Sequence, residues 1–295
     1  MVQSVSEYLT TKELAELLRI KERKVYDLAS SGEVPCSRAM GKLLFPRQAV
    51  EAWLAESSSG YTPAVPTQGP SVVLGSHDPL LEWALRESRS GLATFFDGSL
   101  DGLDRFARGE GVASGLHVFD PASKEWNVPA VRERFARQRI VLVEWAWRER
   151  GLIVAAKNQK KISGIASLKG RRLVPRQPEA GSQGLLMHLL SEAGLGAEDV
   201  SFTAPARSET DAAVAVYEGA ADAALGLKGL ARQHGLGFVP IVKERFDLLV
   251  DRRAWFEPPM QRFIDFCRTD GFLSRASEQH GYDASGFGRV HFNGA

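Results

Sequence analysis

Serine, histidine and aspartate stand side by side at Ser76, His77 and Asp78, and they are the residue types of a hydrolase catalytic triad. Consecutive residues cannot form that triad, because its side chains must converge from separate elements. The sequence also contains no GxSxG nucleophile motif, no HExxH zinc motif and no phosphate-binding loop with a Lys-Ser/Thr pair. The residue types therefore favour a binding protein over an enzyme.

Polar residues recur where helices are expected to begin. The readable helix starts are Ser76–Asp78, Gly98–Ser99, Gly181–Ser182 and Thr210–Asp211. In an open parallel sheet such starts lie beside the carboxyl ends of the strands, so their free backbone N–H groups and positive dipole ends face a cleft. Glycine lets a ligand approach the backbone closely, and serine or threonine adds a hydroxyl group.

Two further residues extend this predicted site. Arg176 lies five residues before Gly181, where a guanidinium group could hold an anion bidentately. His117 follows Gly115 at another expected strand end. The sequence therefore predicts a small-molecule site, with an anionic or polar ligand, formed by Ser76, His77, Ser99, His117, Arg176, Gly181, Ser182 and Thr210.

Each of these residues also has a purely structural interpretation. Serine, threonine and aspartate at helix starts are most often N-caps. Asp78 and Asp211 would themselves occupy the helix-end donors and repel an anion. Arg176 could instead form a salt bridge, and His117 could be a semi-buried histidine with satisfied hydrogen bonds. Sequence alone leaves these alternatives open.

Basic residues gather in one short stretch near the N-terminus. Residues 19–47 hold seven Lys/Arg and three Asp/Glu, a net charge of +4, whereas residues 1–56 hold eight of each. Local positive charge in an otherwise neutral segment is typical of a surface that meets DNA phosphates. The candidate contacts are Lys21, Arg23, Lys24 and Tyr26, with Arg38, Lys42 and Arg47 as phosphate contacts. The alternative is a solvated charged surface.

Two short helices are expected to carry this stretch. Thr10 to Glu13 fits a capping box that starts the first helix. Leu14, Leu17 and Leu18 are spaced as one buried stripe of that helix. A second helix is expected over about residues 21–30. A tight turn joins the two helices, which is typical of a helix-turn-helix unit.

A hairpin and a third helix complete the expected N-terminal domain. Residues 36–45 read as two strands, and Pro46 begins a helix that ends in Trp53 and Leu54. The strings LTTKELAELL from residue 9, KVYDL from residue 24 and GEVP from residue 32 resemble the excisionase-type branch of the mercury-regulator-like winged helices. The resemblance implies that the second helix enters the major groove of DNA and that the wing touches the backbone.

Composition changes after this domain. Residues 57–70 (SSSGYTPAVPTQGP) have neither a helical nor a strand period, so we expect an exposed linker. The linker separates a DNA-binding domain over residues 1–56 from a larger domain over residues 71–295. Strands and helices alternate in the larger domain, which favours an α/β fold with parallel-type sheets covered by helices on both faces.

The larger domain is expected to have two lobes. Candidate crossings divide it into lobe I, residues 71–152 and 246–295, and lobe II, residues 153–245. The SHDP string at residue 76, GSLDGL at residue 98, GSQG at residue 181 and SETDAAVAV at residue 208 resemble the type II periplasmic-binding-protein fold. That fold also serves as the sensor domain of LysR-type bacterial regulators. Similar domains occur beside molybdenum-cofactor proteins, so the resemblance implies molybdate, tungstate or a pterin-type molecule as conceivable ligands.

Composition sets the remaining bounds. The chain has 295 residues, a net charge of +1, 25% charged and 44% apolar residues, which is typical of a globular protein and not of a basic nucleic-acid coat. It shows no signal-peptide pattern and no apolar stretch of membrane-spanning length, so we expect a cytoplasmic protein with no membrane partner. Cys36 and Cys267 fall in different domains, and neither a disulfide, a metal site nor a cofactor is expected.

Together these patterns predict a ligand-responsive bacterial transcriptional regulator. A homodimer would bind double-stranded operator DNA with an inverted repeat, and closure of the lobes on a small-molecule or oxyanion effector would change the spacing of its two DNA-binding domains. One alternative is a cytoplasmic ligand carrier or accessory protein of molybdenum-cofactor metabolism. Another is a DNA-architectural protein whose second domain only dimerises.

Overall fold

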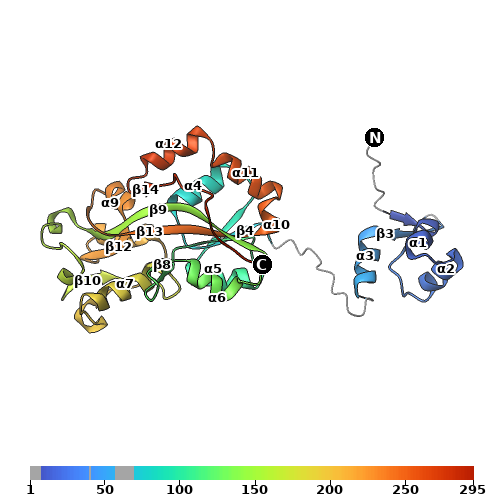
Figure 1. The fold of residues 1–295 in the computed structure, drawn as a ribbon, viewed down its shortest axis with the longest axis horizontal. Helices are drawn as coiled ribbons and strands as arrows, with labels where there is room; N and C mark the ends of the chain where they lie inside the picture. Colours follow the sequence, from blue (N-terminus) through green and yellow to red (C-terminus); the bar gives the residue numbers. More distant parts are fainter. Residues whose placement is uncertain (1–7, 40, 57–69) are drawn as a thin grey trace. The chain divides into compact units, whose positions relative to one another are not determined.

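The computed structural model describes residues 8–39, 41–56 and 70–295 (Figure 1). The chain divides into two compact units, Met1–Thr67 and Gln68–Ala295. The expected linker, residues 57–70, lies outside the described residues except for Pro70. Among the described residues, no helix has the length and apolar character needed to cross a membrane.

The first unit consists of three helices and a small antiparallel sheet within the described residues. Its elements are β1 (Tyr8–Thr10), α1 (Thr11–Leu18), α2 (Glu22–Ser30), β2 (Ser37–Ala39), β3 (Lys42–Pro46) and α3 (Arg47–Glu56). The strand order is β1-β3-β2. The two helices, the hairpin and the third helix therefore follow one another as expected, and β1 is an addition that pairs Leu9 with Phe45.

Local sequence explains how α1 begins and packs. The Thr10 hydroxyl accepts a hydrogen bond from the Glu13 backbone N–H at 3.3 Å, and the Glu13 carboxylate accepts one from the Thr10 N–H at 2.7 Å, so the capping box is confirmed. Leu14 is fully buried, but the expectation for Leu17 was wrong, because its side chain is 47% exposed. Helix α1 has only eight residues and buries Leu14 and Ala15, which leaves Leu17 on the flank of a narrower stripe.

The second unit begins with a parallel α/β segment. Its elements are β4 (Val72–Gly75), α4 (Pro79–Glu87), β5 (Ala93–Phe96), α5 (Ser99–Ala107), β6 (Ala113–Leu116), the short β7 (Phe119–Asp120) and β8 (Glu125–Trp126), and α6 (Val128–Phe135). Strand β4 pairs in parallel with both β5 and β6. A second parallel group, β10 (Arg172–Val174), β11 (Ser201–Phe202) and β12 (Ala223–Leu227), alternates with α7 (Gly181–Glu192), α8 (Glu209–Tyr217) and α9 (Lys228–Gln233).

Two 15-residue strands, β9 (Ile140–Val154) and β13 (Gly237–Asp251), join the two groups. They pair antiparallel to each other, and the sheet order is β11-β10-β12-β9-β13-β6-β4-β5. The chain ends with α10 (Arg252–Trp255), α11 (Pro258–Phe266), α12 (Asp270–Glu278), β14 (Tyr282–Asp283) and β15 (Val290–Asn293), and both last strands pair with β9. We call strands β4–β6 with helices α4–α6 and α10–α12 the first half, and strands β10–β12 with helices α7–α9 the second half.

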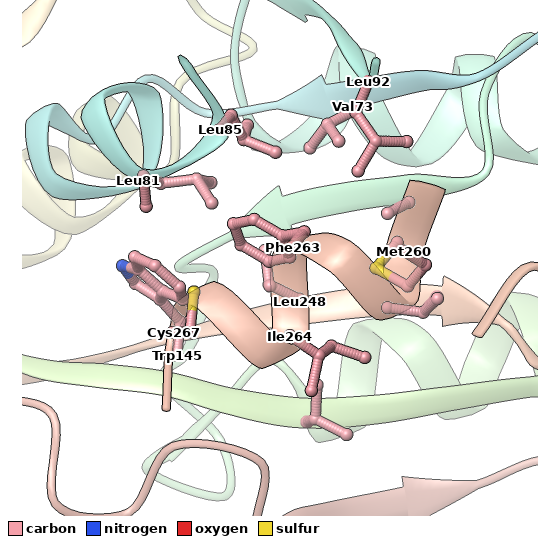
Figure 2. Packing of buried hydrophobic residues seen from close by; sticks show 14 of the residues in the cluster. Val73, Leu81, Leu85, Leu92, Trp145, Leu248, Met260, Phe263, Ile264 and Cys267 are labelled. Atoms are coloured by element: carbon pink, nitrogen blue, oxygen red, sulfur yellow. The ribbon is translucent and has the colours of Figure 1, made fainter. Parts of the chain in front are cut away.

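Each half buries apolar residues on both faces of the sheet. In the first half, α4, α11 and α12 cover one face, while α5 and α6 cover the other (Figure 1). Figure 2 shows the first of these layers, in which Trp145 and Phe263 lie between Leu81 and Ile264, with Cys267 beside them. In the second half, α7 covers one face and α8 and α9 the other.

The observed sheet confirms the α/β class and differs from expectation at its centre. The sequence suggested that new segments begin at the candidate crossings near residues 151–157 and 243–251, yet β9 runs unbroken from Ile140 to Val154 and β13 from Gly237 to Asp251. Gly151 explains the misreading, because a Cβ there would lie 2.2 Å from the Val239 carbonyl oxygen. The glycine permits close passage of two strands and does not end one. The middle of the otherwise parallel-type sheet is therefore antiparallel.

Candidate functional site

Helix α2 presents the candidate DNA-contact side chains. Val25 and Ala29 are buried in the core of the first unit, which turns Arg23, Lys24 and Tyr26 outward. Tyr26 is 52% exposed. Within the described residues, the structure shows no hydrogen bond or ion pair made by the side chains of Lys21, Arg23 and Lys24, so these cations are available to phosphates.

The other basic candidates lie on the hairpin and at its end. Arg38 on β2 and Lys42 on β3 are exposed on paired strands. Arg47 begins α3 and is half-buried. The hydrogen bonds with Thr10 are the main cause of the lowered pKa of Glu13, and the charge of Arg47 lowers this pKa further. The structure therefore places Arg47 near α1.

In the second unit, Asp78 is the buried N-cap of α4. Its carboxylate accepts a hydrogen bond from the Leu81 backbone N–H at 2.7 Å. It also accepts from Trp145 Nε1 at 3.1 Å, from Arg148 Nη1 at 2.7 Å and from the Tyr282 hydroxyl at 2.7 Å. Burial and the adjacent Asp78 charge raise the pKa of Tyr282 well above its usual value, so this hydroxyl stays protonated as a donor.

A series of buried ion pairs continues from Asp78 across the centre of the sheet. Arg148 Nη2 lies 2.5 Å from Glu244 Oε1, and Arg150 Nε lies 2.7 Å from Glu244 Oε2. Arg150 also donates to both carboxylate oxygens of Glu209 at 3.0 and 3.1 Å. Arg176 Nη1 lies 3.2 Å from Glu209 Oε1. We call this set the buried charged cluster: Asp78, Arg148, Arg150, Arg176, Glu209 and Glu244.

The cluster is electrically balanced, with three guanidinium groups and three carboxylates. Burial raises the pKa of Glu209, but the charges of Arg150 and Arg176 outweigh burial and lower it to about 2. Burial also raises the pKa of Glu244, but the charges of Arg148 and Arg150 outweigh burial and hold this pKa well below its usual value. His117 Nδ1 is 3.0 Å from Glu244 Oε2, and burial lowers the pKa of His117, which favours a neutral ring that donates to that carboxylate.

The starts of α5 and α7 meet beside this cluster. Ser99, the first residue of α5, pairs its hydroxyl with that of Ser76 at 2.7 Å and accepts from the His117 N–H at 3.1 Å. A Cβ on Gly181, the first residue of α7, would lie 2.5 Å from the His117 carbonyl oxygen. The structure therefore brings together Ser76, Ser99, His117 and Gly181 from both halves.

Direct contacts also join the halves at this place. The Leu100 N–H of α5 donates to the Glu179 carbonyl at 3.0 Å, and Arg207 Nη2 lies 2.5 Å from Asp97 Oδ1. Gln177 Nε2 donates to the Asp97 carbonyl at 3.2 Å. The two halves are thus closed upon each other where a ligand cleft is expected.

Two buried polar atoms at this junction have no hydrogen-bond partner within residues 70–295. They are the hydroxyl oxygen of Ser182 and Oε1 of Gln177, on residues that are 2% and 4% exposed. Native proteins rarely leave such atoms unpaired, and a bound molecule is one way to satisfy them. Ser182 was among the sequence candidates, whereas Gln177 was not.

The other sequence candidates are placed differently. Arg176 belongs to the buried charged cluster and also donates to the backbone carbonyls of Ala206 and Arg207. His77 Nε2 lies 3.1 Å from Glu82 Oε2 within α4. Thr210 is the second residue of α8, and the capping role that its position suggested belongs to Ser208. Within residues 70–295, neither His77 nor Thr210 forms a hydrogen bond or ion pair with the residues at the helix junction.

Sequence reasoning missed Arg148, Arg150, Glu209 and Glu244. A usable signal existed for the two arginines, because residues two apart on a strand point to the same side. Nothing in the spacing of Glu209 and Glu244 indicates that they are the partners of the two arginines. In the described part of the chain, no group of three or more His, Cys, Asp or Glu side chains is placed to hold a metal ion.

Family comparisons match both units. The model of the PBP superfamily domain matches residues 82–268, and that of the helix-turn-helix domain matches residues 8–58. The Bacillus subtilis (strain 168) protein named "Uncharacterized protein YvgK" is 23% identical over 299 residues, covering 95% of this chain and 96% of its own.

One solved structure shares the fold of the larger unit, and a second shows a weaker likeness. A putative phosphate ABC transporter substrate-binding protein from Clostridium perfringens, with bound phosphate, superposes with a TM-score of 0.51 at 12% identity. It covers 71% of this chain and 97% of its own. A putative L-cystine ABC transporter protein from Listeria monocytogenes has a TM-score of 0.48 at 13% identity, covering 74% of this chain and 97% of its own.

Proposed function

The chain belongs to the family of the PBP superfamily domain and carries a helix-turn-helix domain ahead of it, and from this pairing we propose that it is a transcriptional regulator whose DNA affinity depends on a small molecule. The observation that carries the proposal is the presence of both modules in one chain. The unpaired cations of α2 support the DNA role, and the unpartnered Ser182 and Gln177 atoms support the ligand role. The proposal assigns no reaction to the chain and places it in the cytoplasm with the chromosome.

The proposed effector site lies where α5 and α7 meet, lined by Ser76, Ser99, His117, Gly181 and Ser182, with Gln177 added from the structure. The proposed lobes are those expected from the sequence, residues 71–152 with 246–295 and residues 153–245. In this proposal the contacts of Asp97 with Gln177 and Arg207 open to admit the effector and close again around it. Such closure is the step that would change the DNA-binding arrangement.

The chemistry of the effector is constrained by the buried charged cluster. Its three arginines are already neutralised by three carboxylates, so an anion that bound there would have to displace Glu209 or Glu244. The unpartnered atoms at the helix junction are a hydroxyl and an amide oxygen, which suit a polar ligand. Molybdate, tungstate or a pterin remains a prediction from family resemblance without support from these contacts.

A DNA-binding measurement tests the first part of the proposal. We expect the Arg23→Ala/Lys24→Ala double variant to bind promoter DNA from beside its own gene at least about tenfold more weakly than wild type, with a salt dependence reduced by about two units of slope per bound subunit. Fluorescence anisotropy over a range of salt concentrations measures both. Lys160→Ala/Lys161→Ala, which removes two exposed charges from the second unit, is the matched control.

Equal binding by the α2 variant and its control would reject the assigned DNA surface. The second part requires ligand screening by thermal shift, followed by the same anisotropy measurement with any molecule that raises the melting temperature. A ligand that stabilises the protein and leaves DNA affinity unchanged would instead support the carrier function.

A further inference from the structure

A groove separate from the helix junction runs between α9 of the second half and α4 and α12 of the first half. Its inner part encloses about 150 Å³ and its outer part about 450 Å³. The two parts share Gly229, Gln233, Arg275 and Gln279, so they are continuous. Figure 1 shows α9, α12 and α4 on the same side of the long strands, with α9 at the second half.

Cationic groups from both halves line this groove. Arg232 is contributed by α9, Arg275 by α12 and Arg86 by α4, and all three are exposed. Arg232 Nη1 lies 3.4 Å from His280 Nδ1, and no described carboxylate forms an ion pair with it. The acidic residue that lines the groove is Glu278, which lies 3.8 Å from Arg275 with both side chains solvated.

Arg86 lies 3.8 Å from the exposed Glu87, so Arg232 is the groove arginine that has no carboxylate partner among the described residues. An exposed pair at 3.8 Å is weak, so Glu278 neutralises Arg275 only in part. Guanidinium groups bind carboxylate and phosphate oxygens bidentately and keep their charge at every physiological pH. The amides of Gln233 and Gln279 add further hydrogen-bond donors to the same wall.

The floor of the groove is kept open by a glycine. A Cβ on Gly229 would lie 3.4 Å from Gln279 Oε1 and from the His280 carbonyl, so a larger side chain there would occupy the space between α9 and α12. Gly229 lies near the start of α9, and its replacement changes no charge. It therefore offers a way to block the groove and keep its arginines.

We propose that this groove is a second binding site, for a small anion that carries two or more negative charges and bridges Arg232 and Arg275. Carboxylate and phosphate groups share the required chemistry, and the experiment distinguishes them. Because the two arginines come from different halves, the bound anion would hold the halves at one separation. The proposal stands apart from the effector role of the helix junction and does not require it.

Isothermal titration of the full chain at low ionic strength with citrate, and separately with pyrophosphate, tests the proposal. We expect wild type to bind at least one of them at a single site, Arg232→Gln and Arg275→Gln each to weaken that binding about tenfold, and Gly229→Leu to abolish it. Arg268→Gln, which removes an exposed arginine of the first half that pairs with Asp265, should bind like wild type. Citrate binding alone would identify a carboxylate site and pyrophosphate binding alone a phosphate site.

Several results would overturn the proposal. The first is no binding of either anion to wild type. The second is binding that Arg268→Gln weakens as much as Arg232→Gln does, since this would indicate general charge attraction. The third is anion binding that Arg232→Gln and Arg275→Gln leave unchanged. Circular dichroism melting of each variant establishes that it is folded before titration.

Discussion

At the residue scale, Glu209 has an unusual position for a carboxylate. It is 1% exposed and is the first residue of α8, where the helix dipole favours negative charge. Arg150 and Arg176 supply the counter-charges that its burial requires. Removing only the carboxylate charge would leave buried Arg176 without a carboxylate partner and Arg150 with Glu244 alone.

We therefore expect Glu209→Gln to lower the free energy of unfolding by about 3–5 kcal/mol, the usual cost of breaking a buried ion pair. Urea denaturation at neutral pH measures this change. Glu110→Gln is the control, because Glu110 pairs with Arg105 and Arg108 in an exposed position where loss of a pair costs at most about 1 kcal/mol. Similar losses in both variants would show that the cluster around Glu209 is no more important than a surface pair.

The low pKa of Glu209 makes this stabilisation depend on pH. Its folded-state pKa of about 2 lies below the usual 4.5, so the stabilising effect is complete above about pH 4.5 and disappears as the pH falls towards 2. The difference in unfolding free energy between wild type and Glu209→Gln should shrink over that window, as urea titrations at several pH values would show. A difference that stays constant would contradict the assigned pKa.

The pKa of Asp247 is shifted upward, opposite to that of Glu209, and this shift does not affect the comparison of wild type with Glu209→Gln. Burial raises its pKa to about 6 despite the Arg245 charge and the Asn127 hydrogen bond, so its ionisation lowers stability as the pH rises from about 4 to 6. Wild type and Glu209→Gln both contain Asp247. Its contribution therefore cancels in their difference.

Residue-level prediction succeeded where a local rule applied. The capping box of Thr10 and Glu13 and the burial of Leu14 follow from short-range spacing, and both are confirmed. The partners of Arg150 could not be predicted, because Glu209 and Glu244 lie 59 and 94 residues away in the sequence. Whether the proposed ligand-contact residues bind a ligand remains a prediction for experiment.

At the element scale, two glycines in α7 have contrasting surroundings. A Cβ on Gly181 would lie 2.5 Å from the His117 carbonyl oxygen and 3.0 Å from Ser99 Oγ, whereas a Cβ on Gly184 would meet nothing within 4 Å. Glycine at position 181 is thus required by the close approach of α7 to the first half. Glycine at position 184 has no such requirement.

We expect Gly181→Ala to lower the free energy of unfolding by about 1–3 kcal/mol, since the methyl group forces neighbouring backbone apart. Gly184→Ala should raise it by about 0.5–1 kcal/mol, because alanine restricts the unfolded chain and favours helix. Thermal and urea denaturation of the two variants provide the measurement. If Gly181→Ala were as stable as Gly184→Ala, the contact of α7 with the first half would not exist in solution.

Element boundaries in the central strands resisted prediction for a specific reason. Within the β9–β13 pair, register shifts leave Trp145 and Ile241 opposite no partner residue. Each shift reverses which side chains face which side of the sheet, so a simple two-residue period fails across it. Arg148 and Arg150 are charged residues in the middle of β9, yet both are buried and paired. Only the assembled sheet supplies the partners that make such a strand stable.

At the scale of the whole molecule, one helix-turn-helix unit covers a single DNA half-site. We therefore expect the protein to form a dimer of twice its 32.3 kDa chain mass and to bind an inverted repeat. Light scattering after size-exclusion chromatography measures the mass. DNase footprinting should show half-sites whose centres are about 10–10.5 base pairs apart or a multiple of that spacing. A monomer that protects one asymmetric site would contradict this prediction.

The way the chain leaves the central strand pair at the end of β9 and returns to it at the start of β13 has an evolutionary consequence. Val154 at the end of β9 pairs with Gly237 at the start of β13, so residues 155–236 form an insertion whose two ends are neighbours. A cassette from a homologue can be joined at these points without stretching either flank. Arg176 and Glu209 travel with that cassette, whereas Arg148 stays behind. Recombination at these two junctions would thus exchange Arg176 and Glu209 of the buried charged cluster together. A single genetic event could in this way change which ligands the protein prefers.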